Sequence, residues 1–92
     1  MNYKLRFTTN ALKDIRLHKK SGDKKLLRKI EILLEELMTH PKTGTGQPEQ
    51  LKYELQGLYS RRINRKHRLV YEILDDIVTV VILSIYSHYD DK

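Results

Sequence analysis

The chain has 92 residues and no cysteine, and its 18 Lys and Arg against 12 Asp and Glu give a formal net charge of +6. This length supports one modest core, so we expect a single domain over residues 1–92. Disulfides and thiolate chemistry are excluded, and no apolar run approaches the roughly 20 residues that cross a membrane. The first residues do not resemble a signal peptide, which favours the cytoplasm. The positive charge suits a polyanion such as nucleic acid, or an acidic protein.

The first part of the chain predicts one strand and two helices. Residues 3–8 alternate apolar and polar side chains, which is typical of a half-buried strand. A short helix capped by Thr8 or Thr9 follows and ends at Ser21-Gly22. Asp23 can cap a second, stronger helix. The apolar stripe of this second helix consists of Leu26, Leu27, Ile30, Leu33, Leu34 and Leu37.

The second part predicts strands in hairpin connection. Residues 43–48 have turn composition, and two strands are expected at about 59–64 and 67–74, joined across Asn64-Arg65-Lys66. The run 77–83 is rich in β-branched residues, as expected of an internal strand covered on both faces or nearly so. We therefore predict an α+β fold, with two N-terminal helices packed on one face of a twisted antiparallel sheet.

Loop length decides where Arg62 and Arg68 lie. A three-residue loop places them opposite each other on one face, with Ile63, Leu69 and Tyr71 in an apolar layer on the other. Like charges at such positions destabilise a sheet unless an anion lies between them, and guanidinium groups bind phosphate oxygens in pairs. A two-residue loop would instead put the two arginines on opposite faces.

Other interpretations of the basic residues stay open. Both of these arginines can pair with Glu72 or Glu54, or can simply be solvated. Arg61 and Arg65 are expected to face solvent or a partner. Anion binding, pairing with a glutamate and solvation are thus the interpretations that the sequence allows for Arg62 and Arg68.

Glu49 and His88 complete the set of groups that RNA cleavage without a metal requires. Such cleavage needs a base for the 2′-hydroxyl proton, an acid for the departing 5′-oxygen, and cations that stabilise the phosphorane. A loop glutamate is ordinarily solvated and a histidine near a terminus is ordinarily exposed, so neither residue indicates catalysis by itself. His18 and His40 are expected on the surface near helix ends. No spacing of His, Cys or Asp predicts a metal site.

Three motifs in order resemble the YoeB/Txe toxins, which belong to the RelE/ParE superfamily of bacterial toxin–antitoxin systems. They are Gly44-x-Gly46-x-Pro48-Glu49-x-Leu51-Lys52, then Leu55-x-Gly57-x-Tyr59-Ser60-Arg61-Arg62-Ile63-Asn64-x-x-His67-Arg68-Leu69-Val70-Tyr71, and finally His88-Tyr89. The resemblance implies a RelE-like microbial ribonuclease fold. It also implies an endoribonuclease that cleaves messenger RNA, typically in the ribosomal A site, and uses no cofactor.

The resemblance also implies roles for individual residues. Glu49 matches the general base and His88 the general acid, while Arg62 and Arg68 match the arginines that contact the scissile phosphate. Lys52 and Tyr89 match the supporting lysine and the terminal tyrosine, and Arg61 and Arg65 are added as candidate RNA-binding residues because they are expected to face solvent or a partner. One departure is the tail Asp90-Asp91-Lys92 after the His-Tyr pair, since its carboxylates would repel RNA phosphate and could raise the pKa of His88.

The implied partners are a cognate antitoxin, messenger RNA and the ribosome, and operator DNA through the antitoxin complex. Homodimers are common in such families. Two alternatives remain at this point: a ParE-like toxin that inhibits gyrase without cutting RNA, and a basic nucleic-acid-binding module without catalysis. A toxin that has lost its activity would carry the same motifs.

Overall fold

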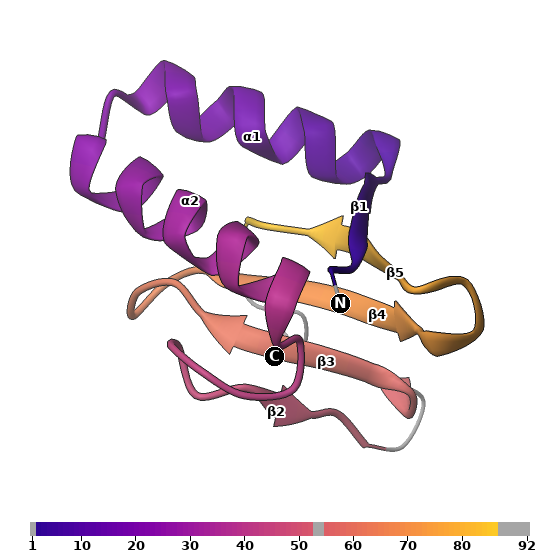
Figure 1. Cartoon of the computed structure of the whole chain (residues 1–92). Coiled ribbons are helices and arrows are strands. Elements are labelled where there is room, and N and C mark those ends of the chain that lie inside the picture. Colours follow the sequence, from indigo (N-terminus) through magenta and orange to yellow (C-terminus); the bar gives the residue numbers. More distant parts are fainter. Residues whose placement is uncertain (1, 53–54, 87–92) are drawn as a thin grey trace.

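The computed structural model describes residues 2–52 and 55–86 (Figure 1). Two helices lie on one side of a five-stranded sheet. In chain order the elements are β1 (Lys4–Phe7), α1 (Thr9–Ser21), α2 (Lys24–Thr39), β2 (Glu49–Gln50), β3 (Leu58–Arg62), β4 (Arg68–Leu74), the 3-10 turn η2 (Asp75–Ile77) and β5 (Thr79–Ser84). The predicted α+β fold is confirmed.

The sheet has the strand order β1-β5-β4-β3-β2. β2, β3, β4 and β5 pair antiparallel, whereas β1 runs parallel to β5, with Lys4 opposite Thr79 and Phe7 opposite Ile82. The sheet is therefore mixed, and the expectation of a wholly antiparallel sheet is corrected at this edge. The alternation of residues 3–8 shows which side chains share a face, but it carries no information on the direction of the neighbouring strand.

The helix starts follow from the predicted caps. The Thr8 hydroxyl accepts a hydrogen bond of 3.0 Å from the Ala11 N–H, and the Asp23 carboxylate accepts one of 3.0 Å from the Leu26 N–H. Both helices turn an apolar side toward the sheet, α2 with five of the six residues of the stripe expected from its sequence, while Leu27 lies outside the core. The buried core comprises Ala11, Leu26, Ile30, Leu33, Leu37, Ile63, Leu69, Tyr71, Val80, Ile82 and Ile85.

The β3–β4 hairpin has the three-residue loop that was one of the two sequence-based alternatives. Tyr59 lies opposite Tyr71 and Arg62 opposite Arg68, and the Ile63 N–H donates to the His67 carbonyl over 3.0 Å. The Asn64 side chain fixes the turn, because its Oδ1 accepts from the backbone N–H groups of Lys66 at 2.9 Å and His67 at 2.7 Å.

One strand was not predicted, and another begins later than the sequence indicated. β2 was not predicted, since Glu49 and Gln50 carry no strand pattern and pair only because the preceding turn brings them to β3. β5 begins at Thr79 rather than at residue 77, because η2 precedes it and Val78 adopts a left-handed conformation with φ of 47°. β5 is nonetheless internal in the sheet, between β1 and β4.

The sheet therefore has two different faces. Leu69, Tyr71 and Ile82 belong to the core cluster together with residues of α1 and α2, so they lie on the face that the helices cover. The alternate positions of the same strands, including Ser60, Arg62 and Arg68, lie on the opposite face, which neither described helix covers and which we call the uncovered face. Within the described ranges, no helix is both long and apolar enough to span a membrane.

Candidate functional site

The uncovered face brings together three of the predicted site residues. Glu49 of β2 lies opposite Ser60 of β3, and Arg62 of β3 lies opposite Arg68 of β4. The Arg68 guanidinium contacts residues of both β3 and β2. Its Nη1 donates to Ser60 Oγ over 3.3 Å and lies 3.7 Å from Glu49 Oε1. A carboxylate, a hydroxyl and two guanidinium groups thus lie side by side on three adjacent strands.

These groups differ in their exposure. The Glu49 side chain is 60% exposed, whereas that of Arg68 is 17% exposed. Arg62 is also exposed. Positive charge is therefore concentrated at an accessible surface, next to a carboxylate that solvent or substrate can reach. Such an arrangement can bind a phosphate between the arginines and present a base beside it.

Four further predicted site residues are Lys52, Arg65, His88 and Tyr89. Lys52 and Arg65 are exposed, the first just after β2 and the second in the β3–β4 loop. His88 and Tyr89 lie outside the described residues, as does the tail 90–92. Their proposed roles stay predictions.

Arg61 corrects the sequence analysis, because it does not face solvent. Its side chain lies on the helix-covered face of the sheet and is fully buried there. The reason is the alternation of β3, in which Arg61 pairs with Leu69 and therefore shares the face of Ile63 and Tyr71. In this structure Arg61 does not lie on the surface where RNA contact was expected.

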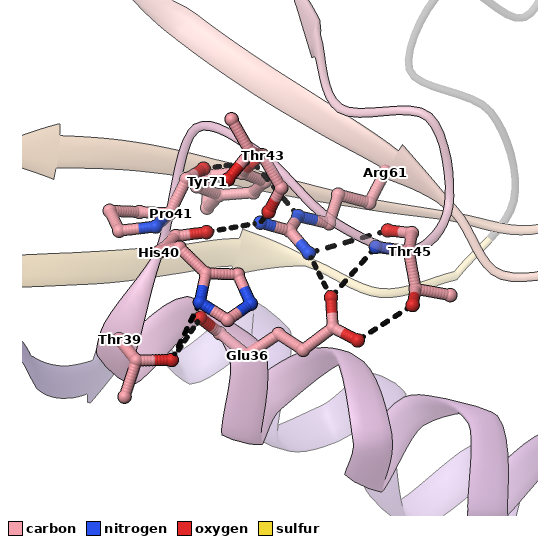
Figure 2. Close-up of polar contacts among 8 residues, drawn as sticks. All are labelled: Glu36, Thr39, His40, Pro41, Thr43, Thr45, Arg61 and Tyr71. Carbon is pink, nitrogen blue, oxygen red and sulfur yellow. Dashed lines mark hydrogen bonds and ion pairs between the residues drawn. The ribbon is translucent and has the colours of Figure 1, made fainter.

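Figure 2 shows what the buried guanidinium binds. Nη1 donates to Glu36 Oε1 at 2.8 Å and to the Thr45 carbonyl at 3.3 Å. Nη2 donates to the carbonyls of His40 at 2.7 Å and Thr43 at 2.6 Å. Nε donates to the Tyr71 hydroxyl at 3.2 Å. A guanidinium has five N–H donors, so every one has a partner.

Three further hydrogen bonds extend this group of contacts. The Tyr71 hydroxyl donates to the Pro41 carbonyl at 2.7 Å, and Glu36 accepts from the Thr45 N–H at 2.7 Å and the Thr45 hydroxyl at 2.6 Å. We call Arg61, Glu36, Thr45, Tyr71 and the carbonyls of residues 40, 41 and 43 the Arg61 cluster. It connects the end of α2 and the following loop to the helix-covered face of β3 and β4.

The cluster shifts the titration of two of its members. Partial burial acts to raise the pKa of Glu36, but the hydrogen bonds from Thr45 and the bond and charge of Arg61 outweigh it and hold this pKa below its ordinary value. Burial raises the pKa of the Tyr71 phenol, against the opposing effect of Arg61. Glu36 is therefore a carboxylate and Tyr71 a neutral phenol at neutral pH.

A second buried polar group holds the chain just after β5. The Asp14 carboxylate accepts a hydrogen bond of 2.8 Å from the Ile85 N–H, and His18 Nε2 lies 2.9 Å from the Ile85 carbonyl. The His18 ring stacks on Tyr86 and meets His67 edge-on. The expectation that His18 lies on the surface is wrong, because the i, i+4 spacing puts it on the buried side of α1 with Asp14.

Sequence reasoning missed the buried residues for an identifiable reason. Ser60 and the inward position of Arg61 both follow from β3 alternation once Tyr59 and Ile63 are assigned to the core. Glu36 and Asp14 carry no comparable signal, since a charged residue on an amphipathic helix is ordinarily solvated. Among the described residues no group of three or more His, Asp or Glu could hold a metal ion.

The comparisons with known proteins identify the family. The model of the YoeB-like toxin of bacterial type II toxin–antitoxin systems matches residues 7–89. The chain belongs to this family. Toxin YoeB of Synechocystis sp. is 47% identical over 68 residues, which cover 74% of this chain and 77% of the relative.

Solved structures of YoeB toxins agree with the fold. A YoeB dimer from Staphylococcus aureus superposes with a TM-score of 0.81 at 38% identity, covering 97% of this chain and 100% of the other. A heterotetrameric YoeB–YefM toxin–antitoxin complex from the same organism gives a TM-score of 0.78 at 38% identity, with the same coverage. The resemblance found in the sequence motifs is thus confirmed at the level of the family and the fold.

Proposed function

We propose that this YoeB-family chain is an endoribonuclease that cleaves messenger RNA, in the ribosomal A site, and thereby blocks translation. The observation that best supports this is the position of Glu49, whose carboxylate lies 3.7 Å from Arg68 on the exposed face that also presents Arg62. A base next to a phosphate-binding pair is the arrangement that metal-independent RNA cleavage needs.

The proposed reaction is an internal transfer within the RNA. Glu49 takes the proton of a 2′-hydroxyl, whose oxygen attacks the adjacent phosphorus. Arg62 and Arg68 stabilise the charge on the phosphorane oxygens. The bond from phosphorus to the 5′-oxygen then breaks, and His88 donates the proton that this oxygen acquires. The products are a 2′,3′-cyclic phosphate and a free 5′-hydroxyl.

The ion pair between Glu49 and Arg68 suits this reaction. Exposed ion pairs contribute only about 0–1 kcal/mol, and the Glu49 side chain is 60% exposed. A phosphate, which binds a guanidinium through two oxygens, can therefore take the place of Glu49 on Arg68 at little cost. The carboxylate is then left beside the bound phosphate, where the 2′-hydroxyl lies.

The partners follow from the family and from the charge. The S. aureus relative is found as a dimer and in complex with the antitoxin YefM. For this chain we propose a cognate antitoxin with an acidic segment, operator DNA bound through that complex, and a homodimer. Lys52, Arg65 and Tyr89 would support RNA binding or the transition state. Cleavage of ribosome-bound messenger RNA would take place in the bacterial cytoplasm.

Inducible expression in bacteria tests the proposal. Messenger RNA 5′ ends are mapped by primer extension after induction of the wild type, Glu49→Gln, His88→Ala and the control Glu35→Gln, which removes an exposed carboxylate from α2. We expect new 5′ ends with the wild type and the control, and a rate lowered roughly 100- to 10,000-fold by either catalytic-site variant.

Other results would overturn the proposal. Growth arrest without new ends would indicate a target other than RNA, such as gyrase. Cleavage by His88→Ala and Glu49→Gln at the wild-type rate would exclude the acid–base mechanism. Binding of RNA without cleavage or growth arrest would indicate a non-catalytic module.

A further inference from the structure

The loop that the Arg61 cluster holds lies directly before β2, the strand that carries Glu49. We infer that Arg61 and Glu36 are positioning residues for Glu49: they fix the loop after α2 so that β2 places this carboxylate beside Arg68. The inference rests on the proposed RNA cleavage. It gives a function to a partly buried ion pair that does not reach the uncovered face.

The contacts concentrate on backbone atoms of one short segment. Arg61 and Tyr71 together bind the carbonyls of residues 40, 41, 43 and 45, over distances of 2.6–3.3 Å. Glu36 binds the N–H and hydroxyl of Thr45. Because a guanidinium is planar and rigid, it fixes these oxygens relative to one another as well as to β3. The loop position is therefore determined up to Thr45.

Little freedom remains between Thr45 and Glu49. The Gly46 carbonyl accepts a hydrogen bond of 2.7 Å from the Arg62 N–H, which attaches the next residue to β3. Gln47 has a φ of 52°, an uncommon conformation for a side-chain-bearing residue. Pro48 then has a restricted φ of its own. The displacement of Thr45 would consequently be passed along the chain to the carboxylate.

The two loop glycines show how closely the segment lies against the cluster. Gly44 has a φ of +119°, and a Cβ there would collide with Glu36 Oε1 and lie 3.2 Å from Arg61 Nη1. At Gly46, with a φ of +86°, a Cβ would lie 2.8 Å from the Arg62 carbonyl oxygen. The backbone approaches both the cluster and β3 more closely than any other residue would allow.

β3 thus contributes to the site from both of its faces. Arg61 points inward and holds the loop, and its neighbour Arg62 points outward at the place proposed for the phosphate. The same strand therefore sets the position of the base, through the loop, and of one phosphate ligand. Misplacement of a catalytic group by about 1 Å can lower a rate by roughly 100-fold, so this coupling bears on catalysis.

Cleavage kinetics on ribosomes carrying a short messenger RNA test the inference. The cluster is weakened by Glu36→Gln, which removes the charge, and by Thr45→Val, which removes one hydroxyl and leaves no buried charge unpaired. Glu35→Gln is the matched control, because it removes the same charge from an exposed position one residue away. Each variant is also made in a Glu49→Gln background, and urea unfolding gives the folded fraction of every protein.

We expect the two cluster variants to lower kcat by roughly 10- to 100-fold with KM nearly unchanged, because RNA contacts stay in place. In the Glu49→Gln background the same substitutions should cause almost no further loss, since residues that act through one group are not additive. The control should cleave at the wild-type rate in both cases.

Three outcomes would overturn the inference. The first is a kcat of the folded cluster variants equal to that of Glu35→Gln. The second is a loss that is undiminished in the Glu49→Gln background, which would show that the cluster acts on something other than Glu49. The third is absence of cleavage by the wild type, which would remove the proposed function itself; the first two leave that function intact.

Discussion

Arg62 and Arg68 are direct cross-strand neighbours on the uncovered face of the sheet. Like charges in this position destabilise a sheet, whereas an anion between them is stabilised by both. We therefore predict that replacing one of these arginines lowers the rate of RNA cleavage but leaves the stability of the fold unchanged or raises it.

The variant Arg62→Gln should be as stable as the wild type, or more stable by up to about 1 kcal/mol at low salt, because the repulsion is removed. Its cleavage rate should fall by roughly 100-fold or more, because one donor to the phosphorane is lost. Urea unfolding and RNA cleavage measure the two effects. A strongly destabilised Arg62→Gln protein would contradict the assignment of Arg62 to an anion.

Arg61 should behave in the opposite way to its neighbour. Substitution Arg61→Met removes the donor of three carbonyls and the only cationic donor of the partly buried Glu36 carboxylate among the described contacts, so we expect a loss of about 3 kcal/mol in the free energy of unfolding. Arg62→Met, at an exposed position on the same strand, should change it by about 1 kcal/mol or less. Equal losses from the two substitutions would show that the Arg61 cluster does not stabilise the fold.

The lowered pKa of Glu36 predicts a dependence of stability on pH. The folded pKa lies below that of the unfolded chain, so the stabilisation is complete above about pH 4.3 and is lost as the pH falls through the folded pKa. Thermal midpoints of the wild type and Glu36→Gln should therefore differ at neutral pH and converge in acid. A difference that stays constant down to acid pH would mean that Glu36 has the same pKa in both states.

Asp14 should hold the backbone in place just after β5 through its hydrogen bond with Ile85. Its carboxylate is the acceptor for the buried Ile85 N–H, and an unsatisfied buried donor costs about 1–3 kcal/mol. Asp14→Ala should lower the free energy of unfolding by this amount and accelerate hydrogen exchange at the Ile85 amide. Asp76→Ala, which removes an exposed carboxylate from η2, should change stability by no more than about 0.5 kcal/mol. Unchanged exchange at Ile85 in Asp14→Ala would refute the role of this hydrogen bond.

The parts of the fold that the sequence predicted are those with strong local patterns. The α2 stripe, the Thr8 and Asp23 caps and the three-residue hairpin loop depend on neighbouring residues only, and the structure confirms them. The direction of β1 and the existence of β2 depend on segments far along the chain. Neither follows from alternation, because a short strand is specified by its partner.

Within the candidate site, the uncovered face was predictable and its support was not. Period-two alternation put Arg62 and Arg68 together once the loop length was chosen. The same alternation places Arg61 inside, but its charge argued for solvent, and only the loop after α2 supplies the oxygens that make its burial favourable. A local pattern does not show which groups will bind a buried charge, because those groups come from another part of the chain.

Because β1 pairs with β5, the sheet can be completed only late in the synthesis of these residues. The Thr8 hydroxyl donates to the Leu83 carbonyl, 75 residues further along the chain. Since the N-terminal part is made first, β1 and both helices emerge before their sheet partner exists, and only α1 and β1 can cover part of the apolar side of α2 until β3, β4 and β5 follow. Closure of the sheet therefore waits until β5 has been made, and a nascent chain that ends before β5 cannot assemble this fold.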